Sequence, residues 1–101
     1  MQLARVLGQV VSTVKEPALD RHTLLLLTDV PPTGGRDDGQ DPGDSGYVAV
    51  DLVGAGVGEV VLVCSGGAAR VAAGAEVPVD RAVVAIADSV IRAGTVTYSK
   101  S

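Results

Sequence analysis

Residues 47–70 read YVAVDLVGAGVGEVVLVCSGGAAR, a stretch in which strand-forming runs alternate with glycine-rich turns. In residues 48–52 large apolar side chains alternate with smaller or polar ones, as a pleated strand requires. The apolar run 60–63 is typical of a strand that is covered on both faces. Three glycines between the two runs permit a chain reversal that side chains would obstruct, at Gly54, Gly56 and Gly58. The stretch contains no catalytic constellation and therefore predicts a building block rather than an enzyme.

Strand patterns continue on both sides of this stretch. Residues 4–14 carry small or apolar side chains at the even positions Ala4, Val6, Gly8, Val10 and Val14, which predicts a long strand with its even face toward the core. The segment 15–21 holds a proline and an aspartate and should turn the chain. Residues 22–28 contain four consecutive leucines, and we expect a strand with one face toward the inside of the fold and the other toward a neighbouring subunit.

The C-terminal third predicts a short helix followed by two strands. Residues 67–74 are rich in alanine and end in glycine, a combination that favours a short helix closed at Gly74. Residues 83–90 and 95–98 predict the last strands, with a bend or bulge at Gly94. Five principal strands and one short helix predict an all-β fold, a small closed or nearly closed barrel that hides its sheet edges.

Length and composition limit the classes of protein to consider. The 101 residues predict one domain over 1–101, and 47% of them are hydrophobic, more than one small barrel readily buries, so we expect apolar surface to meet other subunits. Residues 31–46 are rich in Pro, Gly, Asp and Ser and predict a mobile acidic loop. No apolar run approaches the roughly 20 residues of a membrane span, and no secretory signal is recognisable at the start, so we expect a cytoplasmic protein.

Cofactor and metal motifs are incomplete in this sequence. The run from Gly54 to Gly58 lacks the third glycine of a dinucleotide fingerprint, where Glu59 stands, and no phosphate-binding Gly-Lys-Ser or Gly-Lys-Thr is present. The aspartates of the 31–46 loop do not have the spacing of a calcium-binding EF-hand. Cys64 is the only cysteine, so neither an internal disulfide nor a cysteine zinc cluster can form. We therefore predict no cofactor and no metal.

The sequence also lacks the sets of residues that catalysis and nucleic-acid binding require. His22, Ser65 and the aspartates include the residue types of a catalytic triad, but no nucleophile-elbow motif marks Ser65 as activated. A net charge of −4, two tyrosines and no other aromatic residue offer neither a basic groove nor a base-stacking platform. The sequence therefore predicts no nucleic-acid partner.

Several motifs resemble the EutN/CcmL family of bacterial microcompartment vertex proteins, whose pattern joins Asp-x-Val-Gly-Ala-Gly-x-Gly-Glu to a downstream Gly-x-Ala-Arg. Residues 51–59 match the first motif, and residues 65–70 the second. Residues 77–80, 83–88 and the opening 4–15 also follow in the family's order. The 31–46 segment departs from it, because the family pattern has a shorter connection there. The resemblance covers nearly the whole chain and implies an OB-like five-stranded barrel.

The resemblance further implies a noncatalytic homopentamer that caps the corners of a microcompartment shell, beside hexameric shell proteins. A ring that closes after five identical copies needs two different patches on each subunit. We place subunit-interface residues at Asp51, Gly54, Ala55, Gly56, Gly58, Glu59, Arg70 and Asp80, and the lining of the five-fold axis at Ser65, Gly66 and Gly67. Arg70 presents a planar fork of donors that could clamp a carboxylate or carbonyl of the adjoining chain. An alternative is an acidic OB-like module that binds a protein or a small ligand through the 31–46 loop.

Overall fold

A computed structural model describes residues 1–13, 15–31, 46–74 and 77–100. The elements follow one another as β1 (Gln2–Val10), a single 3-10 turn η1 (Pro17–Leu19), β2 (Thr23–Asp29), β3 (Tyr47–Asp51), β4 (Val60–Ser65), α1 (Gly67–Ala73), β5 (Arg81–Ile86), β6 (Ser89–Arg92) and β7 (Thr95–Ser99). The predicted turn at 15–21, the strand after it and the short helix ended by Gly74 are confirmed. Of the predicted 31–46 loop, residues 32–45 lie outside the described residues.

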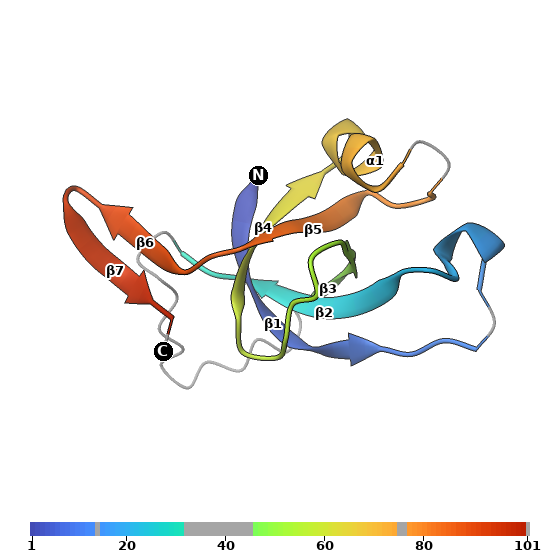
Figure 1. Cartoon of the computed structure of the whole chain (residues 1–101), viewed down its shortest axis with the longest axis horizontal. Coiled ribbons are helices and arrows are strands. Elements are labelled where there is room, and N and C mark those ends of the chain that lie inside the picture. Colours follow the sequence, from blue (N-terminus) through green and yellow to red (C-terminus); the bar gives the residue numbers. More distant parts are fainter. Residues whose placement is uncertain (14, 32–45, 75–76, 101) are drawn as a thin grey trace.

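Five strands close into a barrel in the order β1-β2-β3-β5-β4, which confirms the predicted all-β barrel with one short helix (Figure 1). All neighbouring strands run antiparallel except β3 and β5, which are parallel with Val50 opposite Ala82. The β1–β2 ladder shifts between Val6 and Gly8, and the β4–β5 ladder shifts between Leu62 and Val63. Such irregularities bend strands, and closing so small a barrel requires bending.

The barrel has two apolar clusters, one inside and one under the helix. The inner cluster takes Ala4 and Val6 from the predicted even face of β1, and its members are Ala4, Val6, Leu25, Leu27, Ala49, Val61, Val63 and Val83. The second cluster joins α1 to the outer side of β3, β4 and β5 through Val50, Cys64, Ala69 and Ala82. Strand β4 is therefore covered on both faces, as its apolar run predicts. Cys64 is a free, buried thiol.

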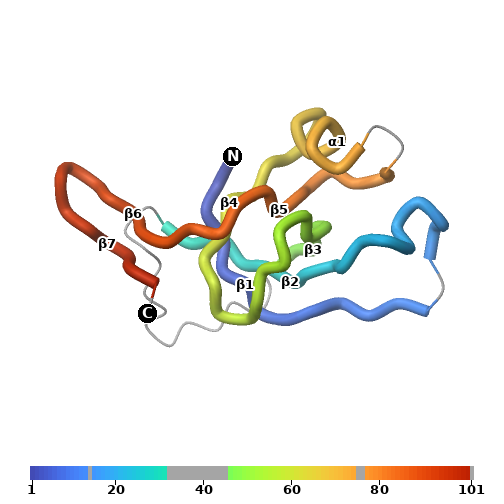
Figure 2. The backbone as a smooth tube through the Cα atoms, in the orientation of Figure 1, coloured from blue at the N-terminus to red at the C-terminus, as the bar shows by residue number. Residues whose placement is uncertain are grey.

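The predicted strand 83–90 is wrong as a single element. Its first part, β5, ends at Ile86, and the Ala87 N–H donates to the Val60 carbonyl (2.8 Å) as the last bond of the β4–β5 ladder. The chain then leaves the barrel, and β6 pairs only with β7 in a separate two-stranded sheet. Of the predicted bend or bulge at Gly94, the bend is confirmed: Gly94 is part of a two-residue hairpin turn, where Ala93 and Gly94 both have positive φ (51° and 79°). Figure 2 shows this hairpin reaching away from the barrel.

Candidate subunit interface

Asp51 organises the glycine turn that joins β3 to β4. Its carboxylate accepts hydrogen bonds from three successive backbone N–H groups, at 3.1 Å from Val53, 3.0 Å from Gly54 and 2.9 Å from Ala55. Gly54 and Gly58 adopt positive φ of 79° and 88°, a conformation that L side chains rarely adopt. The turn is therefore held by a side chain of its own chain, and it presents exposed backbone to the outside.

We expect replacement of Asp51 by alanine to lower the free energy of unfolding by about 1–2 kcal/mol, because three N–H groups lose their acceptor. Urea unfolding at one protein concentration measures the change. The matched variant Asp51→Asn keeps one acceptor oxygen, and its stability should fall between those of the wild type and the alanine variant. Equal stability of the alanine variant and the wild type would contradict the assigned role.

Glu59 is the last residue of the same turn, and its side chain connects the turn to Lys100. Its carboxylate accepts a hydrogen bond from the Gly56 N–H (2.5 Å) and forms a salt bridge with the Lys100 ammonium (2.6 Å). The hydrogen bond from Lys100, followed by the one from Gly56, holds the pKa of Glu59 below its usual value. The same contact raises the pKa of Lys100. Glu59, predicted at a subunit boundary, thus has partners within its own chain.

This ion pair predicts a pH dependence of the hairpin base. A carboxylate with a lowered folded pKa stabilises the fold above its unfolded value, near 4.5, and that contribution is lost as pH falls through the lower, folded value. The Lys100 contribution is present below 10.5 and is lost as pH rises through the raised value. We therefore expect a carboxyl NMR titration of Glu59 to have its midpoint below 4.5, and Lys100→Met to move that midpoint upward. A midpoint that Lys100→Met leaves in place would contradict the pairing.

The segment predicted to line an axis, Ser65, Gly66 and Gly67, is exposed where β4 gives way to α1. The Gly66 N–H donates to the Asp80 carbonyl (2.8 Å), which brings Asp80 beside this segment. Arg70 follows on α1 and is exposed. The structure thus collects five of the predicted residues at one end of β4.

Most of the other predicted residues lie toward the opposite end of that strand. Glu59 immediately precedes β4, and the six residues of β4 separate it from the Ser65 end by about 20 Å. The glycine turn leads to this end, with Ala55 partly buried against the inner cluster. Asp51 holds the turn but is itself level with Val63 within β4, because both residues pair with Val83 of β5. The predicted residues therefore fall into two groups toward the two ends of β4, with Asp51 between them. A cyclic ring of identical subunits requires two different patches on each subunit.

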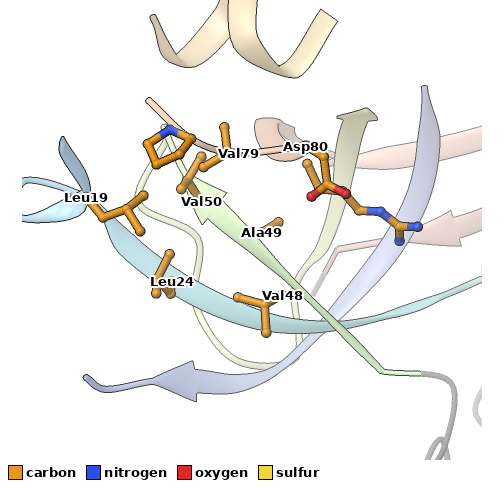
Figure 3. A pocket seen from close by; sticks show the side chains of 9 residues that line it. Leu19, Leu24, Val48, Ala49, Val50, Val79 and Asp80 are labelled. Carbon is orange, nitrogen blue, oxygen red and sulfur yellow. The ribbon is translucent and has the colours of Figure 1, made fainter. Parts of the chain in front are cut away.

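Sequence reasoning missed a groove on the outside of the barrel. Figure 3 shows the side chains of Leu19, Leu24, Val48, Val50 and Val79 around a cavity of about 230 Å³, with Asp80 at its edge. Val48 is 44% exposed although it belongs to a strand of the barrel. The alternation of residues 48–52 was the available signal for Val48, since its neighbour Ala49 faces the inner cluster.

A polar cluster at the start of β3 was missed as well. The Tyr47 hydroxyl donates to the Asp29 carboxylate (2.7 Å), and Gln2 contacts both groups. The Arg81 guanidinium stacks on the Tyr47 ring, 4.0 Å from its centre. Burial, followed by the hydrogen bond to Asp29, raises the pKa of the Tyr47 hydroxyl. These contacts join four strands at one end of the barrel.

The described ranges contain no group of three or more His, Cys, Asp or Glu side chains placed to bind a metal ion. Neither helix in these ranges has the length and apolar character needed to cross a bilayer. Every buried side-chain polar atom in the same ranges has a hydrogen-bond partner.

Comparison with known proteins identifies the family. The family model of the ethanolamine utilisation protein EutN/carboxysome matches residues 1–88. The microcompartment shell vertex protein EutN of Salmonella typhimurium is 43% identical over 101 residues, which cover 99% of this chain and 96% of that protein. Among solved structures, the carboxysome subunit CcmL superposes with a TM-score of 0.85 at 43% identity, covering all of both chains. The pentameric microcompartment shell protein GrpN of Rhodospirillum rubrum superposes with a TM-score of 0.74 at 38% identity, over 91% of this chain and 99% of GrpN. The chain belongs to the EutN/CcmL family.

Proposed function

We propose that this chain is a noncatalytic shell protein that forms homopentamers at the vertices of a bacterial microcompartment in the cytoplasm. The observation that carries the proposal is full-length similarity to shell vertex proteins, in sequence and in fold. GrpN, described as pentameric, shares 38% identity with the chain over most of its length. A pentamer supplies the curvature that a flat layer of hexamers lacks, so we propose hexameric shell proteins as its second partner.

The two patches at the ends of β4 support a head-to-tail ring. The glycine-turn patch comprises Asp51, Gly54, Ala55, Gly56, Gly58 and Glu59, and the helix patch comprises Ser65, Gly66, Gly67, Arg70 and Asp80. We propose that the glycine-turn patch of one copy faces the helix patch of the next, because small residues on one side permit close approach of the charged side chains on the other. Within the helix patch, Ser65, Gly66 and Gly67 would lie nearest the five-fold axis.

Shell assembly tests the proposed function. Hexameric shell proteins should form sheets or tubes when they are produced alone, and closed polyhedra when this chain is co-produced, as seen by electron microscopy. Gly56→Arg, which adds bulk and charge within the glycine-turn patch, should leave the shells open. Closed shells without this chain, or open shells in its presence, would contradict the vertex role.

The alternative of a ligand-binding module has less support. A recess of about 450 Å³ beside Met1, Leu3, Val30 and Leu62 is within the roughly 300–1,000 Å³ of typical small-molecule sites, but among the described residues Gln2 is its one polar lining side chain. The groove, at about 230 Å³, is smaller than that range. Its lining side chains are mostly aliphatic, and they offer few groups that could orient a polar ligand. Residues 32–45, through which that alternative would act, lie outside the described residues.

A further inference from the structure

The β6–β7 hairpin exposes apolar side chains that its own barrel does not cover. Ile91 and Val96 lie opposite each other in the hairpin ladder, and they are 65% and 57% exposed. A two-stranded sheet that packs on nothing is marginally stable in water. The hairpin therefore needs a further surface to cover these side chains.

The base of the hairpin is fixed, so the hairpin forms an arm with a defined direction. The Lys100 N–H donates to the Asp88 carbonyl (2.8 Å), and the Lys100 ammonium pairs with Glu59. On the other side, Ala87 is still bonded to Val60 of the barrel. The tip ends in the tight Ala93–Gly94 turn described above. Because the base of the arm is fixed to the barrel and its apolar side chains are exposed, the arm is suited to contact a neighbouring molecule.

The groove formed by Leu19, Leu24, Val48, Val50 and Val79 is a recess of matching character on the same chain. The hairpin lies at one end of the long axis, and the segments around Leu19 and Val79 lie toward the other end (Figure 1). The longest extent of the molecule is 43 Å, so the arm cannot fill the groove of its own chain. Its volume suits one or two aliphatic side chains, which is what the arm presents.

The apolar side chains, and not the nearby charges, match between the arm and the groove. Arg92 is exposed at the arm, but it pairs with Thr95 and therefore points to the face of the hairpin opposite Ile91 and Val96. The exposed carboxylate of Asp80 stands at the edge of the groove. Arg81 also borders the groove, but its guanidinium is already stacked on Tyr47. The aliphatic side chains of the groove are therefore the part that matches Ile91 and Val96 of a second copy.

We infer that the hairpin arm of one copy packs Ile91 and Val96 into the groove of the next copy. The inference rests on the proposed homopentamer and identifies contacts that would hold it. A projection and a recess at opposite ends of one chain give a heterologous contact, and repetition of that contact around an axis closes a ring. The arm would add an apolar contact to the two patches at the ends of β4.

Paired cysteines test this contact directly. Chains carrying Ile91→Cys and chains carrying Val48→Cys, with different tags, are co-produced and mildly oxidised. We expect a disulfide-linked pair that contains both tags, because the two positions meet only across neighbouring copies. Ile91→Cys with Val71→Cys is the matched control, since Val71 is 86% exposed on α1, and it should give no such pair. Native Cys64 is buried and should not compete.

The outcomes separate this inference from the proposed function. If the wild type is pentameric but the cysteine variants form a disulfide only between two Ile91→Cys chains, the arm-in-groove contact is wrong and the arms pair with each other. If the wild type is pentameric and the variants form no cross-link at all, the arm-in-groove contact is also wrong. Neither result would affect the proposed vertex role. A wild type that is not pentameric would instead refute the proposed function.

A charge placed on the arm provides a second measurement that does not depend on disulfide geometry. Ile91→Glu should raise the protein concentration needed for pentamer formation at least about tenfold, because it puts a carboxylate into an aliphatic recess. Thr95→Glu adds the same charge to the adjacent cross-strand pair, which points to the opposite face of the hairpin, and it should assemble like the wild type. An Ile91→Glu pentamer of normal stability that no longer joins hexameric shell proteins would overturn the inference and assign the arm to that partner.

Discussion

Leu27→Ala is expected to lower the free energy of unfolding by about 2–5 kcal/mol, the largest stability loss predicted for this chain. Leu27 is fully buried in the inner cluster, so its removal leaves a cavity between strands from both ends of the sequence. A small domain has a total stability of about 5–15 kcal/mol, and the variant should therefore unfold at much lower urea concentration.

Leu26 supplies the matched control for this prediction. It is the next residue on the same strand, but it points outward and is 37% exposed. Leu26→Ala should change the unfolding of the monomer far less than Leu27→Ala does. Equal losses for the two variants would mean that the faces of β2 are wrongly assigned.

Gly56→Arg is expected to convert the ring to monomers while the barrel stays folded. Gly56 is exposed in the glycine-turn patch, and a Cβ added there would approach only the flexible end of Glu59, at 3.4 Å. The barrel should therefore tolerate a side chain, whereas an interface that brings backbones close together should not. Native mass spectrometry and circular dichroism together measure the two properties.

Gly56→Ala is the control of minimal size and should retain the ring. Ala55 is a less suitable position for the same test, because it packs against the inner cluster and a bulky charge there would also disturb the barrel. If the Gly56→Arg variant still formed intact pentamers, the assignment of Gly56 to the subunit interface would be wrong.

Most of the fold could be predicted because it follows from local patterns. The apolar run of β4 indicated coverage on both faces, and the structure provides it through the inner cluster and the helix. The alanine-rich segment ending at Gly74 predicted α1. In the turn after β3, Gly54 and Gly58 adopt positive φ, as a reversal built on glycines predicts, whereas Gly56 does not.

The departure of the hairpin could not be predicted from residues 83–90. Their apolar pattern continues across Ala87, and only the end of β4 at Val60 decides where the barrel ladder stops. After β6 has left the barrel, the Ala93–Gly94 turn reverses the chain so that β7 pairs with β6. Residues 83–90 look continuous in sequence, but they form two strands because β4 is too short to pair with all of them.

The candidate site was only partly predictable for a similar reason. The motif residues could be assigned to turns, but whether Asp51 and Glu59 bind their own chain or another depends on where the N–H groups and Lys100 lie in space. The groove gathers Leu19, Val48 and Val79 from three distant parts of the sequence. No local pattern marks such a recess.

The mass of the assembled protein in solution tests the central claim most directly. Native mass spectrometry, supported by sedimentation equilibrium, should find a complex of five times the 10.1 kDa chain at micromolar concentration. A population that consists only of monomers, or of complexes with an even number of chains, would contradict the account that this chain closes into a five-fold vertex.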